Sequence, residues 1–187
     1  EIVSELRKSA ALELSDKIAR SMAELSMANG KFYIAVESAG IDKANASGWD
    51  QVDFLVSTNP GQPLQVLHKV ASGGELSRIS LAIQVVVAKT SIIPTLVFDE
   101  VDAGIGGTTG DVVGRLLRQL GESTQILCVT HLAQVASKAH RHLKVEKSVS
   151  KKGASTTLVV LDGEAKVAEI ARMMGGVAES QQSLAHA

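Results

Sequence analysis

The sequence is poor in cysteine, in aromatic residues and in net charge. Cys128 is the only cysteine among the 187 residues, which excludes an internal disulfide, disfavours a cysteine-based zinc site and fits the reducing cytoplasm. Aromatic residues make up 3%, so the stacking of nucleic-acid bases on aromatic rings has almost no side chains to use. The formal net charge of −1 shows no global basic bias, and any contact with DNA must therefore be local.

Long apolar runs are absent as well. No run approaches the roughly 20 apolar residues that span a bilayer, and no segment resembles a signal peptide, so we expect a cytoplasmic protein without membrane contact. Hydrophobic residues make up 45% of the sequence and charged residues 21%. That composition is typical of a globular domain whose core is built from Leu, Ile, Val and Ala.

The N-terminal residues predict a helix. Residues 1–27 contain neither Pro nor Gly, their apolar residues recur at helical spacing, and Asn29-Gly30 ends the pattern. Because no N-cap signal precedes Ile2, we expect residues 1–28 to be the end of a longer helix or coiled coil, and residues 29–187 to form one lobe. An ordinary amphipathic N-terminal helix explains the same periodicity equally well.

The rest of the chain predicts an α/β fold. Alternating apolar residues at 32–36 and 52–56 indicate two strands with one buried face. Two continuous apolar runs, 95–98 and 125–129, flank a helical pattern at 112–120. This strand–helix–strand unit is typical of a largely parallel sheet that helices cover on both faces.

The segment that follows the second apolar run is basic. Residues 143–149 and 156–161 predict a hairpin, and residues 165–174 predict a final helix. The basic residues either form an edge that contacts DNA phosphates or, as we favour, lie on a solvated hairpin and protect its exposed edge. They are Lys138, Arg141, Lys144, Lys147, Lys151 and Lys152.

A glycine pair precedes a predicted helix in the middle of the chain. Gly73 and Gly74 would each cost roughly 1 kcal/mol in a helix interior, so we assign them to a loop at the helix start, together with Ser72 and Glu75. The unpaired N–H groups and the positive dipole end of the first helical turn can hold an anion such as phosphate.

Reactive side chains follow both apolar runs. Asp99 and Glu100 come after the first run, and Thr130 and His131 come after the second. Ligands gather at the carboxyl ends of parallel strands, so these residues are candidates for one site. One carboxylate can hold Mg2+ while its neighbour activates a water molecule, and the histidine can donate a hydrogen bond to a phosphate.

Three motifs occur in the order and approximate spacing of the ABC-type ATPases. Ser72-Gly73-Gly74-Glu75 resembles the ABC signature, Leu96-Val97-Phe98-Asp99-Glu100 the Walker B segment, and Thr130-His131 the switch histidine. Longer strings resemble more specifically the RecN family of bacterial DNA-repair proteins, in the SMC-like branch of these ATPases. Those strings are residues 57–64, 71–78, 98–107 and 128–136.

The resemblance implies the C-terminal lobe of a P-loop ATPase head, and two such heads that sandwich two ATP molecules. Ser72, Gly73, Gly74 and Glu75 would contact the γ-phosphate of ATP bound to the partner head. Asp99 would support Mg2+ through water, Glu100 would be the general base, and His131 would sense the phosphate. The implied activity is ATP hydrolysis in DNA double-strand-break repair, recombination and the SOS response, with DNA and the recombinase RecA as partners and a nucleoid-associated location.

The chain departs from the family pattern in two places. The stretch Ala103-Gly104-Ile105-Gly106 lacks the aspartate that ends the loop after Walker B in many relatives, so the role of that aspartate is not carried over. No Gly-x-x-x-x-Gly-Lys-Ser/Thr sequence occurs in the 187 residues. In RecN-like proteins this Walker A sequence lies in an N-terminal lobe beyond a long coiled coil, and we expect little or no ATP hydrolysis without it.

Two other functions fit parts of the pattern. A nucleotide-binding subunit of an ABC transporter would share the three motifs, but Val101-Asp102 follows Glu100 where such subunits usually have Pro-Thr. A non-catalytic lobe that dimerises or contacts DNA through residues 138–152 would need the basic segment alone.

Overall fold

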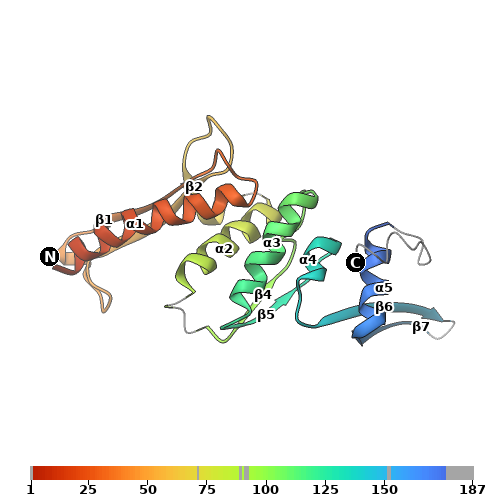
Figure 1. The fold of residues 1–187 in the computed structure, drawn as a ribbon. Helices are drawn as coiled ribbons and strands as arrows, with labels where there is room; N and C mark the ends of the chain where they lie inside the picture. The colour runs from red at the N-terminus through yellow and green to blue at the C-terminus, as the bar shows by residue number, and fades with distance from the viewer. Residues whose placement is uncertain (1, 71, 89, 91–92, 151–152, 176–187) are drawn as a thin grey trace.

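The computed structural model describes residues 2–70, 72–88, 90, 93–150 and 153–175. The molecule is elongated, with α1 and the first sheet at one end, α2 and α3 in the middle, and β6–β7 with α5 at the other end (Figure 1). The helices are α1 (Ile2–Glu24), α2 (Gly73–Val87), α3 (Gly107–Leu120), α4 (Ala133–Ser137) and α5 (Gly163–Met173), with 3-10 turns at Ile41–Lys43 and Leu67–Lys69. The strands are β1 (Lys31–Ser38), β2 (Asp50–Ser57), β3 (Gln65–Val66), β4 (Thr95–Phe98), β5 (Gln125–Cys128), β6 (His142–Ser150) and β7 (Gly153–Leu161). Among these described helices, none has the length and apolar character needed to cross a membrane.

Helix α1 packs along an edge strand of an antiparallel sheet. The strand order is β1–β2–β3, so β1 lies at the edge. The Ser15 hydroxyl, buried on α1, accepts the Ile34 N–H of β1 at 3.0 Å and donates to the Ala11 carbonyl oxygen at 2.6 Å. The Ile34 N–H lies on the side of β1 that does not face β2, and α1 covers it. Because a buried N–H needs a hydrogen-bond partner, the Ser15 hydroxyl takes the place of a further strand.

Helix α2 begins with the glycine pair. Ser72 is its N-cap residue, and Gly73 and Gly74 are its first helical residues. The predicted helix start is confirmed, but the assignment of the glycines to a loop is wrong. The N–H groups of a first turn have no intrahelical acceptor, and the glycines there avoid the cost that applies to a helix interior.

Strands β4 and β5 form the predicted parallel pair, and α3 connects them. Thr95 pairs with Gln125 and Phe98 with Cys128. The α/β class is confirmed, but the expectation of a largely parallel sheet is wrong, because β1–β2, β2–β3 and β6–β7 are antiparallel. The chain segments that join the strands explain why these pairs are antiparallel. Parallel neighbours need a crossover of a dozen or more residues, usually an α-helix, and no α-helix lies between the strands of these pairs.

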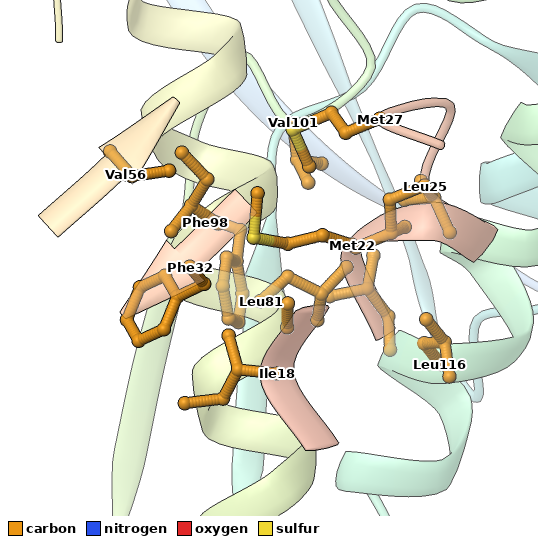
Figure 2. Packing of buried hydrophobic residues seen from close by; sticks show 14 of the residues in the cluster. Ile18, Met22, Leu25, Met27, Phe32, Val56, Leu81, Phe98, Val101 and Leu116 are labelled. Atoms are coloured by element: carbon orange, nitrogen blue, oxygen red, sulfur yellow. The ribbon is translucent and has the colours of Figure 1, made fainter. Parts of the chain in front are cut away.

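One hydrophobic core joins α1 to the parallel pair. Figure 2 shows side chains from α1, β1, β2, α2, β4 and α3 converging on the end of α1. Met22 and Leu25 are fully buried there, although Ile2 and Leu6 at the other end of α1 are exposed. The last turns of α1 thus belong to the same core as β4, and a division near residue 28 stays a prediction.

The hairpin β6–β7 and α5 form the far end of the molecule, as predicted. Glu169 on α5 accepts hydrogen bonds from Arg172, and its carboxylate lies 3.3 Å from Lys144 Nζ on β6. Ile170 packs with Ala133 and Ala136 of α4 in a small second core. Lys151, Lys152 and residues 176–187, which the sequence predictions included, lie outside the described residues.

The contact between α1 and β1 predicts a specific loss of stability. Ser15→Ala leaves the Ile34 N–H buried without a partner, which costs about 1–3 kcal/mol of unfolding free energy. Urea unfolding followed by circular dichroism measures the loss. The matched control is Ser9→Ala at an exposed position of the same helix, which should leave stability unchanged or slightly higher because Ala favours helices. Equal effects of the two substitutions would contradict the assigned role of Ser15.

Candidate functional site

The start of α2 places its polar groups on one side of the candidate site. The Ser72 hydroxyl accepts the Glu75 N–H at 3.4 Å, which is a long N-cap contact. The Glu75 carboxylate accepts the Thr58 hydroxyl at 3.2 Å, from the turn that follows β2. This arrangement leaves the first-turn N–H groups of Gly73 and Gly74 at the positive end of the helix dipole, where an anion is stabilised.

The carboxylates Asp99 and Glu100 follow β4 directly, and both are exposed. Asp99 Oδ1 accepts the Glu100 N–H at 2.9 Å. Glu100 has φ of +56°, in the left-handed region that residues other than glycine, asparagine and aspartate seldom adopt. The chain turns sharply at Glu100 as a result, and such local strain is typical of functional loops.

The glycine start of α2 and the loop after β4 are in direct contact. A Cβ atom on Gly73 would lie 2.5 Å from Glu100 Oε2, and one on Gly74 would lie 3.2 Å from the Glu100 carbonyl oxygen. The absence of a side chain at Gly74 therefore allows a close approach of the two backbones, whereas a Cβ at Gly73 would meet only the end of the flexible Glu100 side chain. The structure thus brings together the glycine motif and Glu100, which the sequence placed on separate elements.

Arg78 strengthens the same contact and was missed by the sequence analysis. Its guanidinium group is buried on α2 and donates to the Ala103 carbonyl oxygen at 2.8 Å. Burial lowers the pKa of Arg78, and the nearby Glu75 charge opposes that shift. A basic residue one turn after the glycine pair was the available signal, but its partner lies 25 residues further along the chain.

His131 lies at the end of the neighbouring strand β5, beside a residue that the sequence analysis also missed. The His131 side chain is 71% exposed, whereas the Asp102 side chain is 3% exposed. Asp102 Oδ2 accepts the Thr130 hydroxyl, the His131 N–H at 2.9 Å and the Leu132 N–H at 3.3 Å, and lies 3.2 Å from His131 Nδ1. The only sequence signal for Asp102 was a charged residue between the apolar residues Val101 and Ala103.

The electrostatics of the strand ends is dominated by negative charge. Burial raises the pKa of Asp102, but the hydrogen bonds from Thr130 and from the His131 and Leu132 amides outweigh it, so that this pKa lies below its usual value. Burial, with the charges of Asp102 and Asp99, raises the pKa of the Cys128 thiol to about 12. The carboxylates thus lie close enough to Cys128 to form a region that favours a cation.

The carboxylates at the strand ends fit a magnesium ion that is held partly by the protein and partly by the phosphates of a bound substrate. No group of three or more His, Cys, Asp and Glu side chains gathers anywhere in the described part of the chain. Mg2+, however, is commonly bound through one or two carboxylates together with substrate phosphates and water. Asp99 offers the oxygen that does not accept the Glu100 N–H, and this single ligand suits such shared coordination.

Two of the four basic residues that the structure describes in this segment have acidic partners. Lys138 Nζ lies 2.8 Å from Asp111, and Lys144 Nζ lies between Glu146 and Glu169. This pairing agrees with the interpretation of a solvated hairpin, which the sequence analysis favoured over a DNA-binding edge.

Comparison with known sequences identifies relatives over nearly the whole chain. The chain is 54% identical to the DNA repair protein RecN of Vibrio cholerae over 179 residues, and 46% identical to RecN of Haemophilus influenzae over 181 residues. These matches cover 95% and 97% of the chain. Over this segment the chain is similar to RecN proteins. It spans about a third of the length of these RecN relatives, with 32% covered in each.

Solved structures confirm the predicted fold. An SMC head domain with a coiled coil and joint from Pyrococcus yayanosii superposes with a TM-score of 0.62 at 18% identity, over 90% of this chain and 30% of that one. A second structure, described under ATP-driven dimerization and DNA-stimulated activation of SMC ATPases, superposes with a TM-score of 0.54 at 16% identity. The match covers 95% of this chain and 99% of that one. No protein-family profile matches the chain. RecN homology and the SMC head fold therefore agree with the resemblance found in the motifs.

The glycine contact predicts that neighbouring substitutions differ in cost. Gly74→Ala places a Cβ against the Ala103 side chain and the backbone oxygens of Glu100 and Ala103, so we expect a loss of about 1–3 kcal/mol in unfolding free energy. Gly73→Ala meets only the end of the flexible Glu100 side chain, and should cost less. Urea unfolding of both variants measures the difference, and a larger loss for Gly73→Ala would contradict the packing described above.

Proposed function

We propose that this chain is the C-terminal lobe of a RecN-type, SMC-like ATPase head that acts in the repair of DNA double-strand breaks. The observation that carries the proposal is the packing of the glycine start of α2 against the carboxylate-bearing loop after β4. The homology to RecN and the SMC head fold support it independently. Both favour it over the ABC-transporter alternative.

Each site residue then has a role that its position allows. When bound, ATP supplies the phosphoryl group that is transferred, and Mg2+ offsets the charge of the phosphate oxygens. The N–H groups of Gly73 and Gly74, with the Ser72 hydroxyl, bind phosphate oxygens at the start of α2, and Glu75 holds this start against Thr58.

The residues at the strand ends carry out the remaining steps. Asp99 would hold the metal ion through a water molecule. It would use the carboxylate oxygen that does not accept the Glu100 N–H. Glu100 orients the attacking water and accepts its proton. His131, on the next strand end, contacts the terminal phosphate through its exposed ring.

The parallel pair β4–β5 has an exposed apolar face that suits contact with a second lobe. Val97, Leu127 and Val129 are 67%, 46% and 63% exposed, although parallel sheets are normally covered on both faces. Complete burial of such a side chain stabilises by about 1.5–3 kcal/mol, so covering three of them favours association by several kcal/mol. We assign this face to a lobe with the Walker A sequence, because the RecN relatives are about three times as long as the matched segment.

A second head is the other expected partner. One structure of similar fold is described by its ATP-driven dimerization and DNA-stimulated activation. We extend this arrangement to the present chain, with Ser72, Gly73 and Gly74 serving the ATP of the opposite head. DNA would contact the assembled cytoplasmic, nucleoid-associated protein, and RecA is a proposed partner through the RecN homology alone.

Reconstitution of hydrolysis tests the proposal. The chain is mixed with the part of Vibrio cholerae RecN that it does not match, and ATP hydrolysis is measured with and without Mg2+. We expect hydrolysis from the mixture but little from the chain alone, and a loss of about 10²-fold or more in Glu100→Gln, because a general base typically contributes that much.

The matched control is Glu122→Gln, at an exposed position beyond α3, which should leave the rate unchanged. Mg2+-dependent hydrolysis that survives Glu100→Gln would rule out the role given to Glu100. Hydrolysis by the chain alone, abolished by that substitution, would rule out the need for a Walker A lobe.

A further inference from the structure

Asp102 is a buried carboxylate whose contacts all go to one loop. A single oxygen, Oδ2, accepts the Thr130 hydroxyl and the amides of His131 and Leu132, and the same oxygen lies 3.2 Å from His131 Nδ1. Burying a carboxylate is costly unless hydrogen bonds satisfy it, and these donors supply the compensation. The loop after β4 is thus fastened to the loop after β5, 28 to 30 residues later in the chain.

The geometry distinguishes the two nitrogens of the His131 ring. Nδ1 lies against Asp102, while the side chain as a whole is 71% exposed, so that Nε2 on the far side of the ring is the nitrogen accessible to a ligand. An ionised carboxylate only accepts hydrogen bonds, so a hydrogen on the nitrogen that faces its oxygen at 3.2 Å is favoured over a lone pair there. The partner of one nitrogen decides which of the two is protonated in a neutral imidazole.

We propose that Asp102 is the positioning residue of His131: its carboxylate holds the neutral ring in the tautomer with hydrogen on Nδ1 and directs Nε2 toward the ligand. The ring then has a fixed orientation before any ligand arrives. Because the same oxygen binds the backbone of the loop, a movement of the loop after β4 also moves the ring.

This tautomer has a consequence for phosphate binding that rests on the proposed ATPase function. Nε2 of the neutral ring carries a lone pair, and phosphate oxygens are acceptors as well, so these two atoms cannot form a hydrogen bond. His131 donates to a phosphate only when the ring carries a second hydrogen, on Nε2. A contact between His131 and the terminal phosphate is therefore coupled to the uptake of a proton, and the negative Asp102 carboxylate faces the positive ring that results.

Nitrogen NMR of the histidine side chains tests the proposal without nucleotide. The chain is labelled with 15N and studied at about pH 8, where an ordinary imidazole is neutral. The His131 signals are identified by their loss in His131→Gln. We expect the Nδ1–H form for His131, and a shift toward the Nε2–H form in Asp102→Ala, which removes the oxygen that faces Nδ1.

Two controls separate positioning from general damage. His140 is exposed and serves as an internal reference that should not change. Asp111→Asn removes an exposed carboxylate that pairs with Lys138, and should leave the His131 tautomer unchanged. If Asp102→Ala does not fold, the unsubstituted chain still decides, because an Nε2–H form of His131 there would overturn the proposal.

The remaining outcomes also discriminate. A folded Asp102→Ala protein that keeps the Nδ1–H form would show that the carboxylate does not set the tautomer, and would overturn the proposal. The expected tautomer combined with no ATP hydrolysis after reconstitution would support the positioning role of Asp102 while refuting the proposed ATPase function.

Discussion

The close approach between the first turn of α2 and the loop after β4 is the constraint on which the site depends. It depends on the absence of a side chain at Gly74, where a Cβ would meet the Ala103 side chain and the backbone oxygens of Glu100 and Ala103. Arg78 fastens the same two segments from within the protein through the Ala103 carbonyl oxygen. The start of α2 and the loop that carries Asp99 and Glu100 are therefore fixed relative to each other before a ligand binds, although we assign them to the nucleotides of different heads.

A second set of contacts extends this constraint to the next strand end. Asp102 follows the loop that α2 supports, and its buried carboxylate binds the backbone on both sides of His131. The glycine start, the loop after β4 and the histidine loop thus form one connected unit. Each link between these segments is a direct packing contact or hydrogen bond.

The sequence predicted the elements that local patterns determine. The strand ends at Asp99 and His131 followed from apolar runs, and the start of α2 followed from Ser72 and the glycines. The contacts of Ser15, Arg78 and Asp102 were not predicted, because their partners lie 19 to 30 residues away and only the fold brings them together. The antiparallel pairings β1–β2 and β2–β3 were missed for a related reason, since apolar runs indicate that a strand is buried but not which neighbour it has.

We propose that the open face of β4 and β5 receives another lobe of the same kind of ATPase. Hydrogen–deuterium exchange of this chain, with and without the unmatched part of Vibrio cholerae RecN, measures whether that face becomes covered. We expect protection to rise at residues 95–98 and 125–129 and to stay constant in α1, whose buried face is already covered. Binding without added protection in β4 and β5, or protection confined to β6 and β7, would contradict it.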